Sequence, residues 1–262
     1  AAAAEKRAAS REAKESAGLE EFGTWATDMV RSGLASLPGR PANYWETPAA
    51  RLVDAQAPGL ARRVRALEAI PLTGEGWPER MLRELSLLHL VREGWSRMET
   101  LPPEQQMDVR SVLGFTENRD DLLAQAGVKD NWLVLGQRVE EDERIRVQRV
   151  WLWGQGTNRP ALILSFSAGP NQPFDATLLV GTSVEAEVVF YPGGFPVRAL
   201  VRQRAKEVRQ LEGNTWRYPH ETIAVANQFA AEVFSANPWT ERVPLGLAAV
   251  VPQVESGEWF VK

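Results

Sequence analysis

Two histidines are the side chains of this sequence best suited to proton transfer, because histidine titrates near neutral pH. His89 and His220 are 131 positions apart, and neither lies in an HxxxH or HxxE pattern of metal ligands. His89 lies in a strongly apolar helical segment, where we interpret it as structural. His220 precedes a predicted helix and could act as a general base or as an N-terminal cap. Because no nucleophile motif such as GxSxG accompanies it, we favour the structural role.

The acidic and glycine-rich segments lack the spacing of known ligand sites. Glu140, Glu141, Asp142 and Glu143 lie between two predicted strands without the pattern of an EF-hand, so we expect a solvated turn. The turns at 154–156 and 192–194 match neither GxxxxGK[ST] nor GxGxxG. The sequence has no cysteine, which excludes a thiol nucleophile and Cys-ligated zinc within these 262 residues. We therefore expect no enzymatic activity, no cofactor and no metal in this chain.

One segment concentrates positive charge enough to be a candidate partner surface or nucleic-acid surface. Its five basic residues are Arg198, Arg202, Arg204, Lys206 and Arg209. If 196–201 is a strand, Arg198 and Arg202 share a face, and the cluster could bind phosphates or an acidic protein. The alternative is a solvated edge strand whose charges prevent aggregation. The chain as a whole has 30 basic and 34 acidic residues, which disfavours a protein that coats nucleic acid.

The sequence also has ten tryptophans, and Trp132, Trp151 and Trp153 fall on predicted strands of the β-rich half. Trp151 and Trp153 lie on one face of their strand and could stack on nucleic-acid bases. We favour the alternative, in which they cover the core or the seam with the helical half, because a buried aromatic ring removes a large apolar area from water.

Apolar residues recur at helical spacing through about the first 128 residues. The first stripe runs from Leu19 to Leu37, and Pro38 and Pro41 are expected to end its helix. Further helices are expected to begin at Thr47-Pro48, Pro58-Gly59, Trp77-Pro78, Pro102-Pro103 and Thr116, the last ending near Gly127.

After Asp130 the hydrophobic period changes to two, which is typical of strands. We expect strands at 132–139, 144–153, 160–166, 185–191 and 196–201, a helix at 222–234, and edge strands at 245–251 and 259–261. The sequence thus predicts an α+β fold, in which an N-terminal helical bundle (1–128) is followed by a mostly antiparallel β-sheet region with one late helix (129–262).

The sequence contains no run of 18 apolar residues and no leader pattern at its start. We therefore expect a cytoplasmic protein with no membrane association. Because a strand-like piece reaches the last residue, we also expect the chain to be a segment of a longer protein.

Several strings resemble bacterial SWIM-type zinc-finger proteins. Residues 18–21 (GLEE), 28–31 (DMVR) and 53–63 (VDAQAPGLARR) are similar to the region that follows the zinc finger in that family. Residues 132–138 (WLVLGQR), 148–154 (QRVWLWG) and 190–192 (FYP) are similar as well, so the resemblance covers nearly the whole chain.

The resemblance implies an accessory role in a larger assembly. The zinc site of the family is a CxC…CxH string, which a chain without cysteine cannot contain, so zinc is expected only in a finger outside this chain. Members are commonly encoded beside a MoxR-type AAA+ ATPase and a von Willebrand factor A (VWA) protein. We therefore expect a non-enzymatic scaffold module that acts with these partners. Nucleic-acid binding through 198–209 is the alternative, and a hydrolase that uses His220 with a carboxylate is the third hypothesis.

Overall fold

The computed structural model describes residues 2–142, 145–167, 174, 178–211, 219–220, 222–247 and 251–261. The chain forms two compact units that divide between residues 116 and 117. The first is helical and the second is built on β-strands, so the predicted fold class is confirmed. The division lies before the expected boundary at 128/129, because the short helix α6 (Arg119–Leu123) belongs to the second unit.

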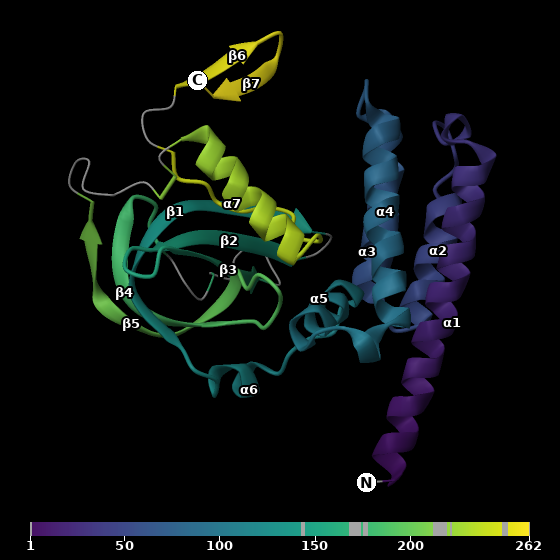
Figure 1. Ribbon diagram of the computed structural model, residues 1–262, viewed down its shortest axis with the longest axis horizontal. Helices are drawn as coiled ribbons and strands as arrows, with labels where there is room; N and C mark the ends of the chain where they lie inside the picture. The colour runs from purple at the N-terminus through teal and green to yellow at the C-terminus, as the bar shows by residue number, and fades with distance from the viewer. Residues whose placement is uncertain are drawn as a thin grey trace. The chain divides into compact units, whose positions relative to one another are not determined.

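Five α-helices make up the first unit, and α1 packs against both α2 and α4 (Figure 1). Their bounds are α1 (Ala2–Ser32), α2 (Asn43–Asp54), α3 (Pro58–Ala66), α4 (Trp77–Ser96) and α5 (Pro103–Leu113). Short 3₁₀ helices follow α1, α3 and α4 at Leu34–Ser36, Leu67–Leu72 and Met98–Thr100. Prolines stand in the first turns of α3, α4 and α5, as predicted, because a proline there removes only an N–H that has no helical partner.

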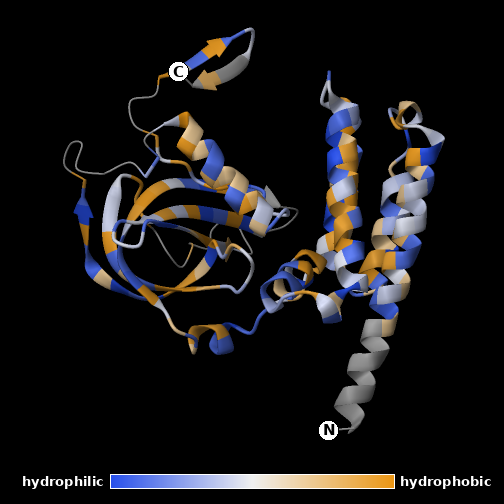
Figure 2. Cartoon of the chain, in the orientation of Figure 1, coloured by the Kyte–Doolittle hydropathy of each residue, from blue (hydrophilic) through white to orange (hydrophobic). Residues whose placement is uncertain are grey.

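Buried residues recur at steps of three and four along these helices. Met81, Leu85 and Leu88 form such a stripe on α4, and the alternation of hydrophobic and hydrophilic residues along this helix is visible in Figure 2. Leu19 and Phe22 form the corresponding stripe on α1. The spacing of apolar residues therefore predicted the faces on which these helices pack.

Several helix ends differ from the sequence-based expectation, and α6 ends at Leu123 rather than near Gly127. Helix α1 ends at Ser32 rather than at the following prolines, because Gly33 adopts a φ of 84°. Helix α2 begins at Asn43, before Thr47-Pro48, since this start places Trp45 on the buried face with Ala49 and Leu52. Helix α6 is capped by Asn118 rather than Thr116, because the Asn118 side chain accepts a hydrogen bond of 2.8 Å from the backbone N–H of Asp120.

A closed five-stranded barrel forms the centre of the second unit, with the strand order β1-β2-β3-β5-β4. The strands are β1 (Val128–Asp142), β2 (Ile145–Gly154), β3 (Arg159–Ser167), β4 (Thr182–Phe190) and β5 (Arg198–Gln210). All pairs are antiparallel except β3 with β5, which pair only at Leu162–Arg198 and Ile163–Ala199. This order, with its one parallel pair, corresponds to that of the OB-fold.

Strand β1 pairs with two neighbouring strands, β4 and β2. Its first part pairs with β4, its last part pairs with β2, and the register against β2 shifts between Val134 and Gly136. The interior of the barrel is filled by side chains from all five strands, including Trp132, Val150, Ile163 and Val188. The barrel therefore has a packed core.

Outside the barrel the chain adds a helix and a hairpin. Helix α7 (Ile223–Ala236) begins after Thr222, whose hydroxyl accepts a hydrogen bond of 3.2 Å from the N–H of Val225. Strands β6 (Pro252–Glu255) and β7 (Glu258–Val261) pair with one another. The strand expected at 245–251 is wrong for its described part, where only Leu247 forms a bridge, with His220. None of the described helices is long and apolar enough to cross a membrane.

Helix α1 lies unusually close to α2 at Gly18. A Cβ placed on Gly18 would overlap the Cβ of Ala55, at the end of α2. Only a residue without a side chain allows this approach, so the distance between the two helices depends on Gly18.

We expect Gly18→Ala to lower the free energy of unfolding by about 1–3 kcal/mol, because the added methyl group overpacks the interface with α2. Ala55→Gly in the same chain should recover most of the loss, since it restores the space. A double-mutant cycle in urea measures this coupling. A neutral or stabilising Gly18→Ala, as helix propensity alone predicts, would contradict the close approach.

Candidate interaction surfaces

His220 is buried in the second unit, with 3% of its surface exposed. Its backbone N–H donates to the carbonyl of Gly246 at 3.1 Å, and the N–H of Gly246 donates to its Nδ1 at 3.1 Å. The ring packs against Phe229, with 4.8 Å between centroids, and against Trp153, with 5.7 Å. Burial lowers the pKa of His220, although the carbonyl oxygen of Gly246, 3.2 Å from Nδ1, acts in the opposite direction because it can accept a proton from the ring. His220 is therefore a neutral structural residue, and Thr222 rather than His220 caps α7.

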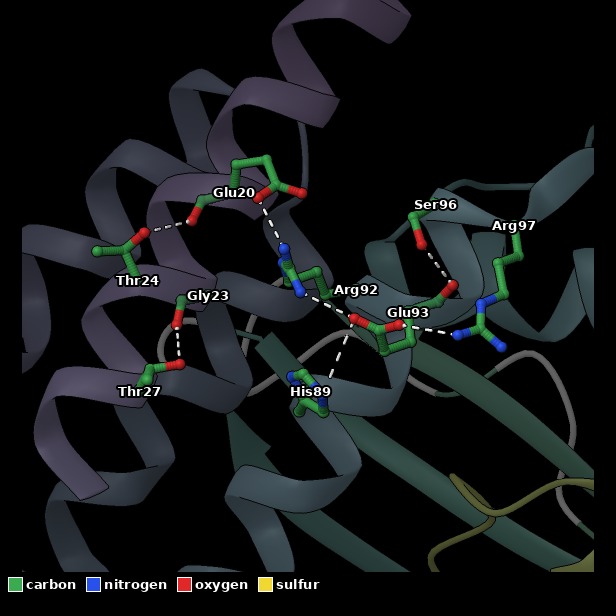
Figure 3. A network of polar contacts seen from close by, with 9 residues as sticks. All are labelled: Glu20, Gly23, Thr24, Thr27, His89, Arg92, Glu93, Ser96 and Arg97. Atoms are coloured by element: carbon green, nitrogen blue, oxygen red, sulfur yellow. Dashed lines mark hydrogen bonds and ion pairs between the residues drawn. The ribbon is translucent and has the colours of Figure 1, made fainter. Parts of the chain in front are cut away.

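His89 lies on the solvent face of α4, with 58% of its side chain exposed, rather than among the apolar residues that flank it in the sequence. Leu88 and Val91 take the buried face instead. The Nε2 of His89 is 3.9 Å from a carboxylate oxygen of Glu93. Glu93 belongs to a network of polar contacts between α1 and α4, in which Arg92 binds Glu93 at 2.8 Å and Glu20 at 2.7 Å (Figure 3).

Three of the four acidic residues, Glu140, Glu141 and Asp142, belong to β1 rather than to the turn that was expected. Glu140 lies within β1, where it pairs with Arg149 and, at 2.8 Å, with Arg138. Glu141 and Asp142 are the last residues of β1, and Glu143 lies outside the described residues. Within the described part of the chain, no three His, Cys, Asp or Glu residues come together as a group that could hold a metal ion.

Asp130 has a structural role that the sequence did not indicate. Its carboxylate accepts hydrogen bonds from the backbone N–H groups of Gly156 at 2.9 Å and Thr157 at 2.8 Å, and from the Thr157 hydroxyl at 2.6 Å. Burial acts to raise the pKa of Asp130, but these hydrogen bonds and one from the Asn131 N–H outweigh it and lower the pKa below its ordinary value. The ionised carboxylate thus holds the turn between β2 and β3 against β1.

The tryptophans of β2 do not form an open stacking surface. Trp153 is 2% exposed, and its ring packs against Phe229 of α7 as well as His220. Trp132 lies in the interior of the barrel. Trp151 is half-buried. Of the two interpretations, burial is right for Trp153, and the helix that covers it is α7 of the second unit.

The five basic residues at 198–209 all lie on β5, but they do not converge on one site. Arg202 binds Glu187 at 2.6 Å and donates to the carbonyl groups of Leu123 and Gln125, so it ties the segment before β1 to the barrel. The guanidinium of Arg198 lies over the ring of Tyr191, 4.3 Å from its centroid. The remaining three, Arg204, Lys206 and Arg209, are exposed.

A register shift interrupts β5 within the basic segment. Gln203 pairs with Glu187 while Val201 pairs with Val188, so Arg202 is an extra residue in its strand. Arg209 lies 3.5 Å from Glu185. Arg204 lines a cleft of about 580 Å³ together with residues of both charges, namely Lys129, Asp130, Glu185 and Glu187. The basic segment is therefore interleaved with carboxylates.

An aromatic cleft between α1 and α2 is the surface that the sequence analysis missed. Its volume is about 370 Å³, and its lining residues are Gly18, Glu21, Phe22, Trp25, Arg40, Pro41, Asn43, Tyr44, Thr47, Pro48 and Arg51. Trp25 and Tyr44 are half-buried, whereas Phe22 is buried behind them. The pair Tyr44-Trp45 beside a helix start was a visible signal, but only the packing of α1 on α2 shows that Trp25 joins it.

The rings of the cleft hold one another in place. The centroid of Trp25 is 5.8 Å from that of Tyr44 and 6.1 Å from that of Trp45, whose ring meets the Tyr44 ring edge-on at 5.1 Å. The guanidinium of Arg40 lies 4.9 Å from the Tyr44 centroid. Burial raises the pKa of Tyr44, although Arg40 opposes the shift, so its hydroxyl is neutral at pH 7. Arg51 pairs with Glu21.

The helical unit also contains the part of the chain that is similar to a known family. A family model described as the SWIM-associated four-helix bundle domain matches residues 10–113. The first unit is similar to this domain over most of its length. This match supports the SWIM-type resemblance and contains the whole aromatic cleft. No curated protein and no solved structure matches the chain.

We expect His220→Phe to lower the free energy of unfolding at pH 8 by about 1–2 kcal/mol, because the N–H of Gly246 loses its acceptor. The native protein should also lose stability as the pH falls below about 6.5, since the unfolded chain then binds a proton that the folded state takes up only at lower pH. Chemical unfolding between pH 8 and pH 5 measures both effects. An equally steep loss in His220→Phe would contradict this account.

Arg202→Ala should lower the free energy of unfolding by about 1–3 kcal/mol, because it leaves Glu187 and two backbone carbonyl groups without their donor. Arg204→Ala is the matched control, and it should change stability by less than about 0.5 kcal/mol because Arg204 is exposed. Thermal unfolding of the two variants makes the comparison. Equal losses of stability in the two variants would contradict the role of Arg202 in tying residues 123–125 to the barrel.

Proposed function

We propose that this chain is a non-enzymatic protein-interaction module of a SWIM-type zinc-finger protein and acts with a MoxR-type AAA+ ATPase and a VWA protein. The observation that carries the proposal is the match of residues 10–113 to the SWIM-associated four-helix bundle domain. The resemblance of both halves of the chain to SWIM-type proteins supports the choice of partners. In this proposal zinc belongs to a finger outside these residues.

The side-chain contacts of the candidate chemical groups support a role in binding rather than catalysis. His220 exchanges hydrogen bonds with Gly246 and is covered by aromatic rings. The carboxylate of Asp130 accepts three hydrogen bonds from Gly156 and Thr157 in the turn between β2 and β3. By contrast, the half-buried rings of Trp25 and Tyr44 lie beside Arg40, and Trp, Tyr and Arg are the residue types that contribute most to protein interfaces.

Nucleic-acid binding is the second candidate function, because the barrel has the strand order of the OB-fold and because Arg204 and Lys206 are exposed on β5. OB-folds commonly bind oligonucleotides on the face of β2 and β3, where α7 here covers Trp153. If this function holds, affinity for an oligonucleotide falls steeply with salt and weakens in the variant Arg204→Ala/Lys206→Ala. A flat salt response excludes it.

Co-purification tests the proposed function directly. The full-length protein that contains this chain, expressed with the co-encoded ATPase and VWA protein, should retain at least one of them on an affinity resin after washing at moderate salt. An unrelated AAA+ ATPase serves as the control and should be washed away. Failure to retain either partner would contradict the proposed function.

A further inference from the structure

We infer that the cleft between α1 and α2 binds a peptide segment of a partner protein in which a bulky apolar side chain is flanked by acidic residues. This inference deepens the proposed function, because it names the surface and the chemistry of the segment that docks on it. It rests on the proposed function only for the identity of the partner.

The apolar part of the recognition follows from the shape and lining of the cleft. Its volume of about 370 Å³ lies in the range of sites that enclose a small ligand or a bulky side chain. Phe22 and Trp45 are 2% and 1% exposed and form a fixed base for the rings of Trp25 and Tyr44. Two half-buried rings on a rigid base give large apolar contact at little cost in conformational entropy. An aliphatic or aromatic anchor is the group that gains most from this lining.

The acidic part follows from the charges at the rim. Two arginines and one glutamate line the cleft, and Glu21 is already paired with Arg51. Arg40 is exposed, and the contacts found for it, the Ser36 hydroxyl at 3.3 Å and the Tyr44 ring, are neutral. A carboxylate placed next to the anchor would form a charge-assisted hydrogen bond with Arg40. The same charge disfavours a cationic segment.

Polar side chains at the rim suit a peptide main chain. Asn43 and Thr47 line the cleft and are exposed, and their amide and hydroxyl groups can both donate and accept hydrogen bonds. An extended peptide carries free N–H and C=O groups on both sides of an anchor residue. The cleft therefore offers separate contacts for the anchor, its acidic neighbours and the main chain.

Selection from a random dodecapeptide display library on the complete chain tests this inference without assuming a sequence. We expect the enriched peptides to share a bulky apolar residue flanked by aspartate or glutamate. Fluorescence anisotropy with an enriched peptide should then show at least a tenfold loss of affinity in Arg40→Glu. Arg31→Glu makes the same charge change on an exposed α1 residue outside the cleft and should change affinity less than twofold.

Trp25→Ala should abolish peptide binding as well, with circular dichroism to confirm that the helices remain. If Trp25→Ala fails to fold, Arg40→Glu still tests peptide binding, because Arg40 is exposed and its replacement leaves the core unchanged. The inference would be overturned if no peptide is enriched, or if the enriched peptides are basic or are proline-rich without acidic residues. Equal affinity of an enriched peptide for Arg40→Glu and for the unchanged chain would overturn it as well. Retention of the ATPase or VWA protein by Arg40→Glu would overturn the cleft as their docking site but leave the proposed function standing. If the cleft binds the enriched peptides but the full-length protein retains neither partner, the proposed function is overturned and the inference about the cleft stands.

Discussion

The close approach of α1 to its two neighbours is the constraint on which the helical unit depends. The backbone of α1 at Gly18 leaves no room for a side chain against Ala55, which follows α2, and a Cβ on Gly23 would lie 2.6 Å from the Nε of Arg92 on α4. Arg92 can therefore cross α1 to reach Glu20, as Figure 3 shows.

Polar contacts then fix the position of α1 along its neighbours. The hydrogen bond with Glu20 raises the pKa of Arg92, so the guanidinium stays charged. Trp95 adds a second contact by donating from its indole N–H to the Ser16 hydroxyl at 3.0 Å. Because α1 is held in this way, Trp25 meets Tyr44 and the aromatic cleft forms at the seam between α1 and α2.

In the second unit, too, polar contacts fix the position of neighbouring segments, because charged and polar side chains tie loops to the barrel. Asp130 holds the turn at 156–157, Arg202 holds the carbonyl groups of residues 123 and 125, and His220 holds Gly246. Each of these side chains has the chemistry of a functional residue and uses it for structure. The surface proposed for a partner is therefore formed by the packing of α1 on α2 rather than by these polar and charged residues of the second unit.

The sequence predicted most of the elements, because the hydrophobic period and the prolines are local signals. It could not predict the barrel, since the parallel pair between β3 and β5 joins strands that are not neighbours in the chain. The extra residue at Arg202 interrupts the register of the basic cluster and has no signal in the sequence, and the exposed position of His89 was hidden by its apolar neighbours. The cleft was missed because Trp25 and Tyr44 lie on separate helices.

Hydrogen–deuterium exchange of the full-length protein, with and without its retained partner, tests the central claim most directly. Binding at the cleft predicts slower exchange at residues 18–25 and 40–51, the two segments that line it, and unchanged exchange in β5. Protection confined to β5, with the α1–α2 seam unchanged, would contradict the account.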